Sequence, residues 1–198
     1  MQKLNPIRVK NMSSPELKYF KELFVRELKL MYWSEKQQLK VLHRLAKASS
    51  TKYLKACFNG HLRATRSHVN RLEKIFFLLN ENNVSKRCTE IDALISEAAA
   101  VTKNTARKTL LRDLALIELA KKMESLEFVK YNRLINSSNE LGNFEVTLLL
   151  EETLIEEQEA KETFEAVMED TLMDEMFSTE NVDAELEATQ GIEELEAV

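Results

Sequence analysis

Apolar residues recur every three or four positions along four long stretches of the chain, residues 14–48, 52–80, 105–135 and 143–172. This spacing gathers apolar side chains on one face of an α-helix, so each stretch is predicted to form an amphipathic helix. Residues 89–101 repeat the pattern over a shorter length. The pattern predicts an all-α protein, and the chain's three glycines and two prolines in 198 residues agree with that fold class.

Two of the links between the long helices are short and one is long. Residues 49–51 and 136–142 are too few to join anything but antiparallel neighbours, whereas the link of about 25 residues around 89–101 can travel the length of a bundle. We therefore expect residues 14–172 to form a ferritin-like antiparallel four-helix bundle, with one long crossover that contains a short extra helix. Residues 1–13 are expected to form an N-terminal extension.

Charge is unevenly distributed along the chain. The net charge is −5, but residues 1–161 contain all 28 Lys and Arg residues and carry +8, whereas residues 162–198 carry −13. Residues 173–198 are predicted to be a mostly disordered acidic tail that folds back on its own bundle, contacts a neighbouring copy or binds another protein partner. Basic residues are dispersed over helical faces without interleaved aromatic residues, so no specific nucleic-acid binding is expected.

The sequence shows no apolar targeting or membrane segment and no metal-binding cysteine motif. No apolar run approaches the ~18 residues that span a membrane, and Met1–Lys10 lacks the apolar stretch of a secretory signal. A cytoplasmic protein without a membrane span is therefore expected. Cys57 and Cys88 do not have the spacing of a metal motif and are expected to be reduced thiols.

Polar residues interrupt the apolar stripe near the midpoint of each long helix. Helix by helix, the interruptions are Glu35; His61, Thr65 and His68; Lys121, Glu124 and Glu127; and Thr153 and Glu156. Midpoints of antiparallel helices of similar length lie at one height, so these side chains are predicted to form one buried polar layer. Isolated carboxylates are costly to bury as charged groups, so the layer needs a positive partner.

Two kinds of partner satisfy this requirement. A pair of metal ions, iron or manganese, is the usual content of a carboxylate layer in a four-helix bundle, and iron would bring redox chemistry. Alternatively, Lys121 neutralises the layer from within, His61 or His68 is hydrogen-bonded, and the layer fixes helix register without any metal. The residues by themselves leave both interpretations open.

Four segments around this layer, Tyr32–Gln37, His61–Glu73, Lys122–Glu127 and Glu152–Glu157, form an ordered set of motifs. They resemble the segments of the YciE/YciF family of bacterial ferritin-like stress proteins, for example its Tyr-x-Ala-Glu-Lys-Gln and Lys-Val-Glu-His-Tyr-Glu motifs. The resemblance extends over about residues 15–170.

This resemblance implies a homodimeric stress protein with a di-metal site. The ligands that it indicates are Glu35, His68, Glu124, Glu127 and Glu156. The side chains expected around those ligands are His61, Thr65, Lys121, Tyr131, Glu152 and Thr153.

The sequence also departs from the family pattern. Arg63, Ala64 and Arg66 replace residues that are acidic or amide-bearing in relatives, and Thr65 and Thr153 stand where a di-iron bundle has Glu. The site is thus short of ligands and is expected to hold one or two weakly bound ions or none. Two functions follow: an enzyme with ferroxidase- or peroxide-type chemistry, or a non-catalytic scaffold or oligomerisation module that uses the acidic tail.

Overall fold

The structure, a computed structural model, describes the backbone of residues 12–196 and the side chains of residues 12–173. It contains five helices: α1 (Ser14–Ala48), α2 (Lys52–Leu78), α3 (Thr89–Asn104), α4 (Leu110–Glu140) and α5 (Phe144–Glu196). No strand occurs between residues 12 and 196, so the all-α prediction is confirmed. Most of the expected N-terminal extension, residues 1–11, lies outside the described residues.

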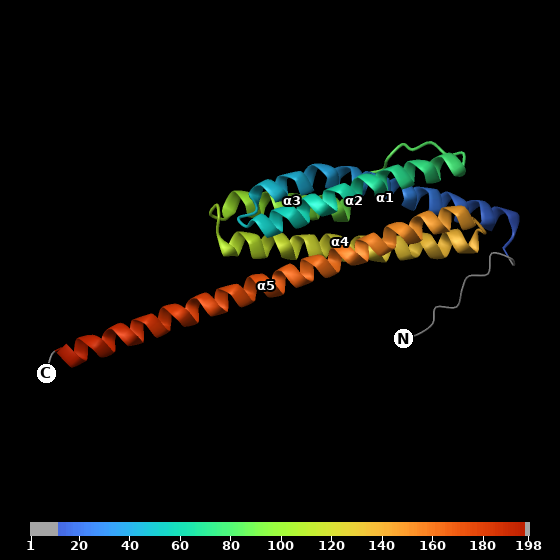
Figure 1. Cartoon of the computed structure of the whole chain (residues 1–198). Helices are drawn as coiled ribbons and strands as arrows, with labels where there is room; N and C mark the ends of the chain where they lie inside the picture. The colour runs from blue at the N-terminus through green and yellow to red at the C-terminus, as the bar shows by residue number, and fades with distance from the viewer. Residues whose placement is uncertain (1–11, 197–198) are drawn as a thin grey trace.

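The four long helices pack lengthwise around a shared interior (Figure 1). α1 packs against α2 and α4, and α5 packs against the other sides of α2 and α4. α3 contacts both α1 and α4 and therefore covers part of the seam between them. Between residues 12 and 196, no helix is both long enough and apolar enough to cross a bilayer.

Side-chain caps fix the beginnings of α1 and α2. At α1, Ser13 and Glu16 form a capping box, in which the Ser13 backbone N–H donates to the Glu16 carboxylate at 2.8 Å. At α2, the Thr51 hydroxyl accepts from the Leu54 backbone N–H at 3.1 Å. The buried carboxylate of Asp113, on α4, accepts from the Ser50 backbone N–H at 2.9 Å and ties the α1–α2 link to α4.

The third long helix begins later than its sequence pattern predicts. The pattern places its start near residue 105, but α4 begins at Leu110 after a turn in which Lys108 has a φ of 58°. The Arg112 guanidinium holds this turn by donating to the Thr102 backbone carbonyl at 2.8 Å and the Thr105 hydroxyl at 2.9 Å. α3 ends before this turn, because its C-cap residue Thr105 is extended, with φ −105° and ψ 149°, so α3 and α4 are separate elements.

The last helix extends further than predicted. α5 runs without interruption to Glu196, whereas a helix to Leu172 followed by a mostly disordered tail was expected. Its C-terminal part projects beyond the other helices, with none of them beside it (Figure 1). Residues 173–198 contain no proline and many good helix formers, and their acidic composition does not by itself break a helix.

Two apolar clusters fill the interior and lie on either side of a polar layer. One is built around Leu42, Leu45, Phe58, Met123 and Phe164. The other is built around Phe24, Leu28, Leu72, Tyr131 and Leu150. Because both clusters are formed by all four long helices, they hold the polar side chains between them at a fixed height.

Candidate functional site

All four long helices contribute side chains to the buried polar layer. Its members, each less than 9% exposed, are Glu35 and Gln38 on α1; His61, Thr65 and His68 on α2; Glu124, Glu127 and Tyr131 on α4; and Thr153 and Glu157 on α5. The structure thus brings together eight residues that the sequence assigned to the site or its surroundings. Gln38 and Glu157 were not among those site residues.

Glu157 is central because two groups of potential ligands share it. Glu35, His68 and Glu157 form one group, and His61, Glu124 and Glu157 form the other; within each group the ligand atoms lie within 4.8 Å of one another. His68 Nδ1 is 2.9 Å from a Glu157 oxygen and 3.5 Å from a Glu35 oxygen. His61 Nε2 is 3.1 Å from a Glu124 oxygen.

Neighbouring polar groups orient two of the carboxylates. The Tyr131 hydroxyl donates to Glu35 at 2.5 Å, and the Gln38 amide donates to Glu127. The two threonines that stand where a di-iron bundle has Glu bond to their own helices instead: Thr65 donates to the His61 carbonyl and Thr153 to the Leu149 carbonyl. These hydroxyls are satisfied within their helices and are not aimed at a ligand.

Glu156 lies at the edge of the layer, in contact with solvent. Its side chain is 28% exposed and accepts from His68 Nε2 at 2.9 Å and from the Arg71 guanidinium at 2.5 and 2.9 Å. Arg71 also donates to Glu152 at 2.7 Å, and Glu152 is 58% exposed. His68 and Arg71 together lower the pKa of Glu156 to about 2.

The inward register of α5 differs from the predicted one by a single residue. The apolar pattern predicts Glu156 as inward, one turn after Thr153, but the structure buries Glu157 completely and leaves Glu156 on the flank that faces α2. Leu150, Glu157 and Phe164 are all buried and are spaced by seven residues, or two helical turns. This spacing was the sequence signal for Glu157, but Leu148–Leu150, three leucines in a row, obscured it.

Lys121 does not enter the interior. Its side chain is 28% exposed and pairs with Glu118 on its own helix at 3.7 Å. The positive side chain nearest the carboxylates is instead His68. Burial by itself would lower the pKa of His68, but Glu35, Glu156 and Glu157 raise it well above its usual range.

Burial keeps the carboxylates of the layer from ionising readily. It raises the pKa of Glu35, raises that of Glu127 well above its usual value, and raises those of Glu124 and Glu157 to about 7. Like charges strengthen the effect, because Glu35 faces Glu124 and Glu124 faces Glu157. Burial lowers the pKa of His61, which favours a neutral imidazole.

Unsatisfied polar atoms test whether these residues suit a metal. Among the described residues, ten buried side-chain nitrogen and oxygen atoms have no hydrogen-bond partner, and all ten belong to the layer. They come from Glu35, Gln38, His61, His68, Glu124, Glu127 and Glu157. Such atoms are costly when left bare, and carboxylate oxygens with imidazole nitrogens are the donors that iron and manganese accept. The donor set therefore fits a metal pair.

The arrangement defines an all-helical protein with a buried layer of carboxylate and imidazole groups. Residues 19–177 match a family model described as a domain of unknown function, DUF892. The chain is 33% identical to Protein YciF of Escherichia coli (strain K12) over 145 residues, which cover 72% of this chain and 86% of that protein. The chain belongs to the DUF892 family, and the resemblance to YciE/YciF proteins inferred from the motifs is confirmed.

Solved structures of similar proteins support the same conclusion. The crystal structure of the E. coli stress protein YciF matches with a TM-score of 0.74 and 29% identity over 77% of this chain and 96% of that one. YcfI from Rhodopseudomonas palustris, provisionally described as a structural protein, matches with a TM-score of 0.72 and 28% identity over 78% and 98%. A protein from Xanthomonas campestris, at 18% identity and a TM-score of 0.63, shares the fold.

Proposed function

We propose that this protein is a ferritin-like four-helix bundle that binds a pair of iron or manganese ions in its buried layer and acts on iron, oxygen or peroxide in a cytoplasmic stress response. The observation that favours this function is the sharing of Glu157 by two ligand groups whose atoms lack hydrogen-bond partners. The similarity to YciF, which is described as an E. coli stress protein, supports the physiological part of the proposal.

Different residues of the layer would hold each of the two ions. Glu35, His68 and Glu157 would hold one ion, and His61, Glu124 and Glu157 would hold the other. Tyr131 and Gln38 hold Glu35 and Glu127 in place by hydrogen bonds, and the apolar clusters above and below exclude bulk water. When bound, iron would supply redox chemistry with dioxygen or peroxide.

Paired variants at adjacent residues test this site. The purified chain should contain iron or manganese after growth with either metal, as measured by elemental analysis. Glu157→Gln should lose most of this metal, because it removes the shared ligand, whereas Glu156→Gln should keep it, because Glu156 binds Arg71. Trace metal in the wild-type chain, or equal losses in the two variants, would contradict the proposal.

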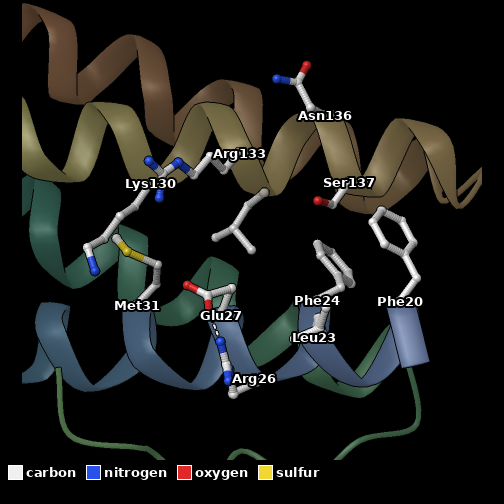
Figure 2. A pocket seen from close by; sticks show the side chains of 11 residues that line it. Phe20, Leu23, Phe24, Arg26, Glu27, Met31, Lys130, Arg133, Asn136 and Ser137 are labelled. Carbon is white, nitrogen blue, oxygen red and sulfur yellow. Dashed lines mark hydrogen bonds and ion pairs between the residues drawn. The ribbon is translucent and has the colours of Figure 1, made fainter. Parts of the chain in front are cut away.

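A second candidate function, oligomerisation through the acidic tail, is favoured by a groove between α1 and α4. The groove has a volume of about 410 Å³, and Phe20, Leu23 and Phe24 of α1 form one apolar wall of it (Figure 2). Lys130 and Arg133 descend into it from α4. Of the charged side chains that line the groove, Arg26 pairs with Glu27 and Lys130 pairs with Glu90, so Arg133 is the basic side chain that an acidic helical segment would meet above the apolar residues.

We propose that residues 173–198 of a second copy occupy this groove. That segment contains nine acidic residues and no basic one. The groove lies near the start of α1, whereas α5 leaves the other helices at the opposite end, so a chain's own tail points away from its own groove (Figure 1). Residues 173–196 of α5 extend about 36 Å as a helix, a length sufficient to reach a neighbouring molecule.

Charge reversal in the groove tests this association. Truncation after Leu172 and Arg133→Glu should both convert dimers to monomers, and high salt should do the same to the intact chain, as measured by light scattering. Arg63→Glu, an exposed change on α2 outside the groove, is the matched control. Dimers that persist after truncation would contradict this function.

A further inference from the structure

A pocket of about 230 Å³ opens between α2 and α5 at the height of the polar layer. Gly60, His61 and Ala64 line it from α2, and Glu156, Glu159 and Ala160 line it from α5. The small side chains on both helices leave the gap, whereas two carboxylates stand among its walls. We call this pocket the α2–α5 port.

Gly60 is not required by packing. A Cβ atom added there would meet no heavy atom closer than the Arg63 side chain, at 3.8 Å, which is an ordinary contact. A glycine inside a helix is less stable than an alanine at the same position, because it loses more backbone freedom on folding. Gly60 thus makes α2 less stable at a position where a side chain would fit, and its effect is to keep the port open.

His61 stands where the port meets the layer. Its side chain is 3% exposed, it lines the port, and its Nε2 is 3.1 Å from Glu124. Its Nδ1 has no hydrogen-bond partner among the described residues, and the contact of Nε2 with Glu124 does not have the geometry of a hydrogen bond. A buried imidazole nitrogen without a hydrogen bond is costly, so the position of His61 at the inner end of the port indicates a ligand that arrives from this side.

We infer that the α2–α5 port is the entry site for divalent cations, with Glu159 and Glu156 at its rim and His61 as the first donor inside. This inference rests on the proposed metal site and adds the route by which that site fills. Glu159 is exposed and would attract a cation from solvent. The charge of Glu156 is partly neutralised by its ion pair with Arg71. From the rim, a cation reaches His61 and Glu124, which belong to one of the two ligand groups.

The test follows the uptake of Co²⁺ by the metal-free full-length chain, using the visible absorbance of bound Co²⁺ in a stopped-flow instrument. Ala64→Leu fills the port and should slow uptake about tenfold or more, because entry would then require local opening of the helices, while the final amount of bound Co²⁺ stays unchanged. Ala56→Leu, on an exposed part of α2 outside the port, is the matched control and should load at the wild-type rate.

Gly60→Ala is a second variant that narrows the port, and it tests the same inference if Ala64→Leu folds poorly. It should raise the melting temperature, through better helix propensity, and yet slow Co²⁺ uptake. Wild-type uptake rates in both port variants, with full binding, would overturn the port and leave the metal site intact. Failure of the wild-type chain to bind Co²⁺ would overturn the proposed function and the port together.

Discussion

The stability of the metal-free chain should fall as the pH is raised from 6 to 8. Glu124 and Glu157 have pKa values of about 7 in the folded protein, against 4.5 for a freely exposed carboxyl. Between these values the folded state binds more protons than the unfolded state does, so the free energy of unfolding decreases with pH. The stabilisation is fully present below pH 4.5 and is lost as the pH rises through 7.

The size of the effect follows from the two pKa values of each group. One carboxyl whose pKa shifts from 4.5 to about 7 loses about 1.3 kcal/mol of stability between pH 6 and pH 8, so the two together lose about 2.5 kcal/mol. The raised pKa of His68 acts in the same direction. The lowered pKa of His61 acts in the opposite direction, but only near pH 6.5, its unfolded value.

Urea denaturation in the presence of a chelator, followed by circular dichroism at pH 6, 7 and 8, measures this loss. Glu157→Gln should reduce the loss between pH 6 and pH 8 by about 1.3 kcal/mol, because it removes one of the carboxyls whose pKa is raised to about 7. Glu151→Gln, an exposed change on the same helix, should leave the dependence as it is in the wild type. Equal stability at pH 6 and pH 8, or greater stability at pH 8, would refute the reasoning.

Three further predictions concern single contacts. Tyr131→Phe should destabilise the chain by about 1–3 kcal/mol in urea titrations, because it removes the buried donor to Glu35; a cost below about 0.5 kcal/mol would show that this bond is unimportant. Asp113→Ala should cost about 1–3 kcal/mol by leaving the Ser50 backbone N–H without its acceptor, and unchanged stability would contradict that role. Leu42→Ala should lower stability by about 2–5 kcal/mol through a cavity in the apolar cluster; a smaller loss would mean that the cluster collapses around it.

Helix positions and the existence of the polar layer were predictable from the sequence. α1 spans Ser14–Ala48 as predicted, and α2 ends within two residues of the predicted position. These features depend on local periodicity and capping, which act within a few turns of one helix. The inward faces of α1 and α2 were identified for the same reason, and that of α4 was identified except at Lys121, which lies outside the layer.

The register of α5 and the interactions between helices were not predictable in this way. Three consecutive leucines fit two rotations of α5 equally well, and only packing against α2 and α4 selects the one that buries Glu157. In the packed structure, Glu156 accepts a hydrogen bond from Arg71, and Lys121 forms an ion pair with Glu118. The helical continuation of α5 to Glu196 was missed because acidic composition was read as disorder, although no helix breaker stands at Leu172.

By itself, the amino-acid sequence determined that the chain is helical and that polar side chains interrupt each long helix at one height, because helical periodicity depends on neighbours three and four residues away. Only the tertiary structure decided which carboxylate lies at the centre of the layer. That choice depends on the rotation of one helix against three others, and no local pattern specifies this rotation when adjacent residues are alike.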